Sequence, residues 1–139
     1  MKVTSFGEVL WDDFPSGKVL GGAPLNVLVR LQSFGVDTAI ISRRGDDADG
    51  EELLRQIKAK NVNTDLLQVC KECDTSLVKV ILDKCGSASY EIVYPCAWDR
   101  IVVEDAALQR VAESDAFVFG SLATRDEISR SALDKLMEK

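Results

Sequence analysis

The sequence predicts an α/β fold built on a parallel β-sheet, with a small β element projecting from it. Strand-like and helix-like segments alternate along residues 1–60. Alternation of this kind favours parallel strands joined by right-handed helical crossovers. Two β-rich runs, Leu77–Leu82 and Ser89–Tyr94, then flank Lys84-Cys85-Gly86-Ser87 and interrupt the alternation. This second pattern is typical of a β-hairpin.

The first predicted element is a buried strand at Val3–Leu10, a run that is short, apolar and rich in β-forming residues. The run leads into Asp12 and Asp13, so we expect carboxylates just past the C-terminal end of this strand. Residues 14–20 contain a proline and a glycine and are expected to form a short excursion with a turn.

A helix is predicted to begin at Pro24, because proline fits the first helical turn, where no N–H donor is needed. The segment is apolar nearly all round until Gly35 ends it, so we expect this helix to be buried. Val36–Ser42 is the next predicted strand. The acidic loop Gly45–Gly50 then opens a second helix, for which it supplies a turn and an N-cap.

The last part of the chain is predicted to form a helix, a strand and a helix. Ala106–Ala112 is the first of these helices, and Ala116–Gly120 is a continuous apolar strand suited to a central position in a parallel sheet. Arg125–Lys139 is the final helix, and no strand follows it.

The composition limits the chemistry available to the chain. Its 139 residues include 17 Lys and Arg, 23 Asp and Glu and no histidine, for a net charge of −6. Nucleophile systems, proton shuttles and metal sites that need an imidazole are therefore excluded. An acidic chain without a block of Lys and Arg is not expected to bind nucleic acid. It has no apolar run long enough for a membrane span and no signal peptide, so we expect a cytoplasmic protein without a membrane partner.

The four cysteines are Cys70, Cys73, Cys85 and Cys96. Cytoplasmic thiols stay reduced by default. Cys70 and Cys73 form a C-x-x-C pair, but a predicted strand separates the other two, so the spacing differs from that of a zinc knuckle. Structural or incidental thiols are the expected reading, with a zinc or redox role as the alternative.

The segment Gly21-Gly22-Ala23-Pro24-Leu25-Asn26 is the strongest candidate ligand site. Two residues without Cβ at a helix N-terminus let backbone amides approach a ligand, and Asn26 faces the same mouth one turn further on. These donors and acceptors suit a polyol. The alternative is that the two glycines only make a tight turn.

Asp12 is the second candidate. We expect it at the carboxyl edge of the sheet, where open α/β sheets bind ligands. A carboxylate there can accept hydrogen bonds from two sugar hydroxyls. An exposed acid in a strand-end loop is the alternative. The sequence contains no Walker A, dinucleotide-binding or kinase catalytic-loop motif that would cradle phosphates.

The order of the motifs resembles the N-terminal half of the PfkB family of carbohydrate kinases, also called the ribokinase family, with fructokinase as the most similar branch. The residues that carry the resemblance extend over essentially all of the chain: Gly7-Glu8-Val9-Leu10-Trp11-Asp12, Gly21–Asn26, Gly35, Gly45-Asp46-Asp47, Gly50 and Phe119-Gly120-Ser121-Leu122. Leu28 departs from the family pattern, which usually has a small residue there, and it implies a packing change in the helix.

The resemblance implies a ribokinase-like three-layer α/β fold with a small β lid, incomplete relative to the family. Residues 1–139 would be the N-terminal part of one sugar-kinase domain, with lid segments at about 14–20 and 75–98. A sugar would bind between lid and sheet and receive the γ-phosphoryl group of ATP on a primary hydroxyl, with Mg²⁺ as cofactor of the full-length protein. The implied substrate-binding residues are Asp12, Gly21, Gly22 and Asn26, with Tyr90 and Ser121 as weaker candidates.

The family's general base lies in a Gly-Ala-Gly-Asp motif, and an Asn-x-x-Glu motif helps to organise magnesium; neither string occurs in this sequence. Both would belong to a half following Lys139, so no catalytic residue or metal ligand is assigned, and ATP and Mg²⁺ are not expected to bind well to this chain. We therefore expect an inactive N-terminal portion of a sugar kinase.

Two other readings remain open. One is a non-catalytic module that senses a sugar or mediates an interaction, and the other is an unrelated small α/β binding domain. The lid or an open sheet edge is expected to mediate homo-oligomerisation, since an incomplete sheet leaves an unpaired edge.

Overall fold

A computed structural model describes residues 1–139 as two four-stranded sheets with helices packed around one of them. The first sheet is parallel, with the strand order β5-β4-β1-β8. Its strands are β1 (Lys2–Phe6), β4 (Asp37–Gly45), β5 (Leu67–Cys70) and β8 (Ala116–Phe119). The α-helices are α1 (Ala23–Gln32), α2 (Ala48–Ala59), α3 (Asp105–Ala112) and α4 (Glu127–Met137), and two short 3-10 helices are η1 (Ala97–Arg100) and η2 (Ser121–Thr124).

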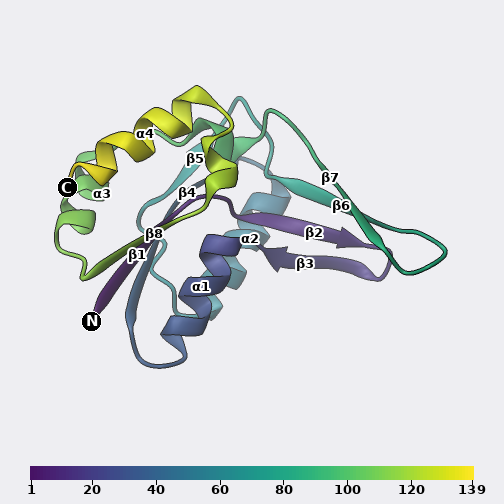
Figure 1. Ribbon diagram of the computed structural model, residues 1–139, viewed down its shortest axis with the longest axis horizontal. Coiled ribbons are helices and arrows are strands. Elements are labelled where there is room, and N and C mark those ends of the chain that lie inside the picture. Colours follow the sequence, from purple (N-terminus) through teal and green to yellow (C-terminus); the bar gives the residue numbers. More distant parts are fainter.

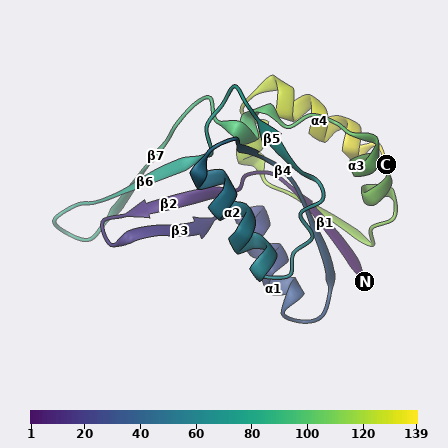
Figure 2. The same ribbon diagram turned by 180° about the vertical axis from the view of Figure 1, so that it is seen from behind.

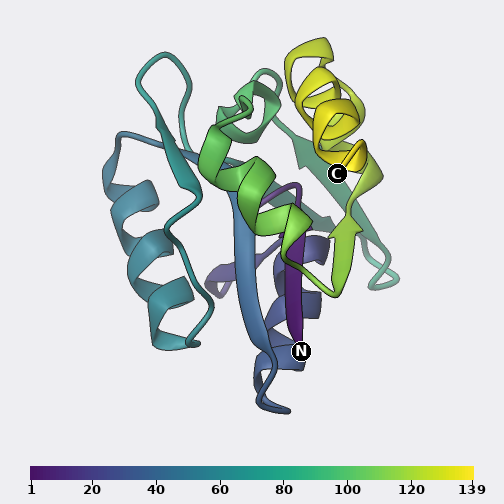
Figure 3. The same cartoon turned by 90° about the vertical axis from the view of Figure 1, so that its left-hand side faces the viewer.

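The parallel sheet is the middle one of three layers. Successive side chains of a strand point to opposite faces, and the neighbours Ile40 and Ile41 on β4 show both faces to be covered. Ile40 belongs to a buried cluster with Leu25 of α1 and Leu53 of α2, whereas Ile41 belongs to a second cluster with residues of η1, α3 and α4. Figure 3 shows α3 in front of the sheet and α1 behind it. The predicted α/β architecture is confirmed.

The second sheet, which we call the projecting sheet, extends away from the three layers (Figures 1 and 2). It consists of two hairpins, and its strand order is β3-β2-β6-β7. The strands are β2 (Leu10–Phe14), β3 (Gly17–Gly21), β6 (Leu77–Leu82) and β7 (Ala88–Ile92). Parallel pairing of β2 with β6, with Trp11 opposite Leu77, joins the hairpins into one sheet. The predicted hairpin around residues 83–87 is therefore present, and a second hairpin lies beside it.

The single strand expected at Val3–Leu10 is wrong, because the chain changes sheets within this run. β1 ends at Phe6, and β2 begins at Leu10 in the projecting sheet. Gly7 has φ 147°, a conformation that side chains rarely adopt, and a Cβ there would lie 2.7 Å from Pro24 Cγ. The turn at Gly7 therefore directs the chain out of the parallel sheet, and Asp12 lies inside β2 rather than in a loop beyond β1.

Helix α1 is amphipathic rather than buried all round. Leu25 and Leu28 are fully buried, whereas Val27 is 40% exposed. The helix ends at Gln32, before the 69% exposed Phe34. Leu28 packs in the same buried cluster as Leu25, so the core accepts the larger residue at this position.

Strand β8 lies at an edge of the parallel sheet rather than at its centre. It pairs with β1 on one side and with no strand on the other, and Phe119 at its end is 46% exposed. At the opposite edge, β5 is a four-residue strand that the sequence did not predict. None of the helices has the length and apolar character needed to traverse a bilayer.

Candidate functional site

The carboxyl ends of β1 and β8 form the topological switch point of the parallel sheet. The two strands are neighbours, but the chain goes from β1 to α1 on one face and from β8 to α4 on the other. Open α/β sheets bind ligands beyond the carboxyl ends of their strands at such a point. Gly7 and Glu8 follow β1 here, and Gly120 and Ser121 follow β8.

Close backbone contacts bring the start of α1 to the same place. A Cβ on Gly22, the N-cap of α1, would collide with the backbone carbonyl oxygen of Glu8. A Cβ on Gly120 would lie 2.8 Å from Glu8 Oε2 and 2.9 Å from Pro24 Cγ. The end of β1, the end of β8 and the first turn of α1 therefore pack directly against one another.

Asp12 and Gly21 connect the projecting sheet to this arrangement. A Cβ on Gly21 would collide with Asp12 Oδ2, so the missing side chain is what makes room for the carboxylate. Gly21 ends β3 and is followed directly by Gly22, so the Asp12 carboxylate lies close to the N-terminus of α1. Burial alone raises the pKa of Asp12 above its ordinary value, and no protein donor acts to lower it. Its oxygens are thus free to accept hydrogen bonds from a ligand.

The strand register places Asp12 and Tyr90 on one face of the projecting sheet. Asp12 is paired with Val78 on β6, two residues before Val80, which is paired with Tyr90 on β7. Paired residues point to the same side of a sheet, as do residues two apart on one strand. Tyr90 lies two strands away from Asp12 and is 64% exposed. The two candidates therefore share a face.

Asn26 and Ser121 lie at the two other borders of the site. Asn26 is exposed in the first turn of α1, where its backbone N–H donates to the Gly22 carbonyl oxygen over 2.9 Å. Ser121 is exposed at the start of η2, directly after Gly120. The N-cap of α1 is Gly22, which has no side chain to cover this end of the helix.

Glu8 is the residue of this site that the sequence did not single out. It is 5% exposed, and its Oε2 has no hydrogen-bond partner within the protein. Burial raises the pKa of Glu8, while the backbone N–H groups of Glu8 and Ala23 act in the opposite direction. The feature of the sequence that could have identified Glu8 is its place as a charged residue directly after a predicted strand and a glycine. This place lies at the edge of the sheet that binds ligands.

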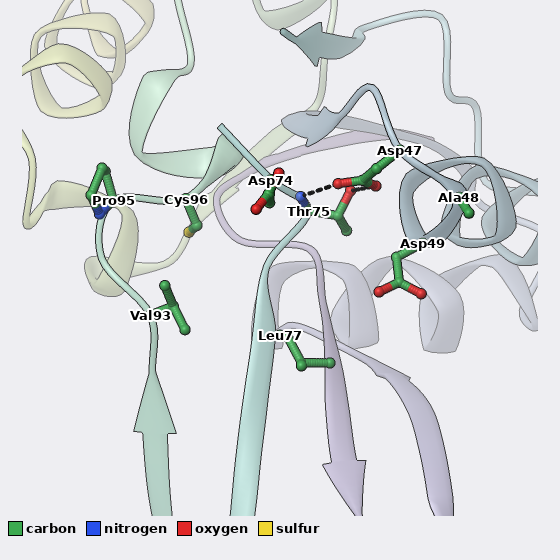
Figure 4. A pocket seen from close by; sticks show the side chains of 9 residues that line it. All are labelled: Asp47, Ala48, Asp49, Asp74, Thr75, Leu77, Val93, Pro95 and Cys96. Carbon is green, nitrogen blue, oxygen red and sulfur yellow. Dashed lines mark hydrogen bonds between the residues drawn. The ribbon is translucent and has the colours of Figure 1, made fainter. Parts of the chain in front are cut away.

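A cavity lies on the other face of the projecting sheet. It has a volume of about 520 Å³ and is lined by the start of α2, the base of β6 and the segment after β7 (Figure 4). Leu77 lines this cavity and is paired with Trp11, whose side chain points away from the face of Asp12.

The acidic residue of this cavity has a structural role. Asp47 accepts hydrogen bonds from the backbone N–H of Gly50 (2.7 Å) and from the N–H and hydroxyl of Thr75 (2.9 and 2.6 Å). The expected N-cap of the second helix is thereby confirmed at Asp47.

The four cysteines and the clusters of acidic side chains are the groups that could hold a metal ion. All four cysteines are free, and burial raises the pKa of Cys96 to about 12, which makes its thiol unreactive. No group of three or more Asp, Glu, Cys or His side chains is placed to hold a metal ion. The ionisable groups at the switch point, Glu8 and Asp12, are acidic and do not suit the phosphates of a nucleotide. Glu8 and Asp12 therefore do not form a binding site for the phosphates of ATP.

Comparisons with known proteins agree with this fold and place the chain among sugar kinases. Residues 7–138 match the description "pfkB family carbohydrate kinase". Fructokinase-2 of Zea mays is 32% identical over 94% of this chain and 43% of that protein. Fructokinase of Solanum tuberosum is 30% identical over 98% of this chain and 45% of that protein.

Solved structures show the same fold. A sugar kinase from Pyrococcus horikoshii in complex with ATP superposes with a TM-score of 0.87 at 28% identity, over 98% of this chain and 48% of that one. Fructokinase of Halothermothrix orenii gives a TM-score of 0.82 at 25% identity, over 99% of this chain and 54% of that one. The expected ribokinase-like fold is confirmed, and the chain spans about half the length of the relatives it matches.

Proposed function

Because the chain belongs to the pfkB family of carbohydrate kinases, we propose that it binds a ketohexose such as fructose at the switch point, beneath the projecting sheet. The observation that supports this most directly is the packing of the Asp12 carboxylate over Gly21, beside the N-terminus of α1. It brings a free acceptor together with the backbone groups at the start of α1, and this combination matches the hydroxyls of a sugar.

Each candidate residue has a role in this proposal. Asp12 accepts hydrogen bonds from two neighbouring hydroxyls, and charge-assisted bonds of this kind are among the stronger ones in proteins. Gly21 makes room for this carboxylate, Gly22 lets α1 pack closely on Glu8, and both offer backbone groups to the sugar. Asn26 supplies both a donor and an acceptor one turn into α1. Tyr90 and Ser121 contact the sugar from the projecting sheet and from the end of β8.

The projecting sheet acts as a lid in this proposal. It carries Asp12 and Tyr90 on one face, so closing this face over the switch point buries the sugar. A lid of this kind excludes water while a phosphoryl group is transferred. The two expected lid segments, residues 14–20 and 75–98, correspond to parts of this sheet and of the segment that leads back from it.

In a full-length protein of this family, the sugar would accept the γ-phosphoryl group of ATP on a primary hydroxyl. The 139 residues contain neither a Gly-Ala-Gly-Asp nor an Asn-x-x-Glu string, and the acidic switch point does not suit a nucleotide. This chain alone therefore binds sugar and transfers no phosphate, because it has neither the base nor the anion-binding amides that the step needs.

Calorimetric titration with D-fructose tests the proposal, and the chain supplies a matched pair of variants. Asp12→Asn removes the charge on the sugar face and should weaken binding about tenfold or more. Asp13→Asn removes the same charge from the neighbouring residue, which points to the opposite face, and should leave binding unchanged. No binding of D-fructose by the unmodified chain, or equal effects of the two substitutions, would refute the site. ATP turnover by the 139-residue chain would refute the expected inactivity.

A further inference from the structure

Glu8 joins the three elements that make up the proposed sugar site. Its backbone carbonyl oxygen packs against Gly22 at the start of α1, and its Oε2 packs against the Cα of Gly120 after β8. The backbone N–H of Ala23 interacts with its carboxyl group. One side chain thus touches the first turn of α1 and the end of β8 from its own place at the end of β1.

The side chain of Glu8 is enclosed by its surroundings. The residue is 5% exposed, and Oε2 is enclosed without a hydrogen-bond partner in the protein. No cation is among the groups that act on it, and burial raises the pKa of its carboxyl group. A glutamine side chain has the same length and keeps an acceptor oxygen at this place.

We propose that Glu8 is a positioning residue of the sugar site, whose carboxyl group fixes the spacing between the Gly22–Ala23 turn and the Gly120–Ser121 turn. The proposal rests on the proposed function, since these turns carry the groups that would meet the sugar. A carboxyl group at this point sets the distance between the two walls, because it lies between the Ala23 N–H on one side and Gly120 on the other. Glu8 itself does not reach the sugar, because Oε2 is covered.

The positioning role of Glu8 depends on its polar group and not only on its volume. Two substitutions of similar size therefore distinguish a polar role from simple space filling. Glu8→Gln keeps the length and an acceptor oxygen, whereas Glu8→Met keeps the approximate volume and loses the polar group. Neither substitution empties the site, so both variants are expected to fold. Leu136→Ala is the matched control, because it damages the buried cluster under α4 and leaves the switch point intact.

The experiment combines D-fructose titration, urea unfolding and the backbone amide NMR shifts of Gly22, Ala23, Gly120 and Ser121. We expect Glu8→Gln to bind within about threefold of the unmodified chain, and Glu8→Met to bind about tenfold more weakly. The four amide shifts should move in Glu8→Met and stay near their original values in Glu8→Gln. Leu136→Ala should lower the urea midpoint while leaving affinity and these shifts unchanged.

Two results would overturn the proposal. One is equal affinity and equal amide shifts in Glu8→Met and the unmodified chain, which would reduce Glu8 to a space-filling residue. The other is an equal loss in Glu8→Gln and Glu8→Met, which would show that a charged carboxylate is required. If the unmodified chain binds no fructose, the proposed function fails, and the amide shifts still decide whether Glu8 sets the spacing of the two turns.

Discussion

The carboxylate of Asp12 fills the space into which a side chain at Gly21 would project, diagonally across the β2–β3 pair. This relationship links the acid to the strand that leads into α1, so the acid and the helix N-terminus are positioned together. The site also requires a glycine at position 21 for reasons of space, although the backbone conformation of Gly21 is one that other residues adopt readily.

Gly21→Ala should therefore impair sugar binding through Asp12. The added Cβ collides with Oδ2 and displaces the carboxylate, so we expect the affinity for D-fructose to fall about tenfold in a calorimetric titration. Combined with Asp12→Ala, the substitution should add little, because the group that it displaces is then absent. Lys18→Met on the same strand is the control, since Lys18 is paired with Asp13 and points to the opposite face of the sheet. Unchanged affinity in Gly21→Ala would place the sugar elsewhere.

Two ion pairs should contribute very differently to stability. Arg125 binds the fully buried Asp99 through two hydrogen bonds of 2.8 Å and lies 4.2 Å over the ring of Trp98. Arg125→Met leaves Asp99 unpaired, so we expect the free energy of unfolding to fall by about 3–5 kcal/mol in urea titrations.

The comparison is with Lys18 and Asp49, whose side chains are 40% and 43% exposed. Lys18→Met should lower the free energy of unfolding by no more than about 1 kcal/mol. Arg125 joins the start of α4 to the segment after β7 through Asp99 and the Val93 carbonyl oxygen. Losses of similar size in the free energy of unfolding of Lys18→Met and Arg125→Met would contradict a larger contribution from this contact.

Asp47 should make the stability depend on pH on the acid side. Burial raises the pKa of Asp47, but the hydrogen bonds donated by Thr75 and Gly50 outweigh it and hold the pKa below its usual value. An acid whose pKa is lowered by folding stabilises the protein above its unfolded pKa of about 3.9, and the contribution is lost as the pH falls through the folded pKa. In urea unfolding between about pH 6 and pH 2, the free energy of unfolding of Asp47→Asn should therefore fall less toward acid pH than that of the unmodified chain. Asp46→Asn, at the exposed neighbour, should retain the slope of the unmodified chain.

Self-association through the unpaired edge of β8 or through the projecting sheet remains a prediction, and two variants distinguish these routes. Phe119 is 46% exposed beside a groove of about 360 Å³ at the β8 edge, whereas Ile81 is 53% exposed on the projecting sheet. In light scattering, Phe119→Lys should lower the average mass if the edge is the contact, and Ile81→Lys if the projecting sheet is. A monomer at every concentration would contradict both routes.

Local signals in the sequence predicted the elements that depend on local chemistry. Proline and two glycines placed the start of α1 within one residue, and β-rich runs around a turn predicted β6 at its observed bounds. The N-cap at Asp47 followed from an acidic loop before an apolar helix face. The elements that were missed depend on contacts between distant parts of the chain.

The division of residues 3–10 between two sheets is the clearest example. The run is rich in β-forming residues at both ends, and it is the packing of Gly7 against Pro24 and Gly120 that ends β1 and directs Asp12 into the projecting sheet. Strand β5 is four residues long and is defined mainly by its pairing with β4. Glu8 acquires its significance from the end of β8, more than a hundred residues later in the chain.

The parallel pairing of β2 with β6 also determines the order in which the molecule can assemble. The strands of this pair are separated in the chain by β3, α1, β4, α2 and β5. Pairing between such distant segments closes a long loop, and this entropy cost is met most easily once the intervening residues are already structured. We therefore expect the projecting sheet to form late in folding, so that an unfolded or half-folded chain has no means of holding a sugar and the binding surface is completed in the final step.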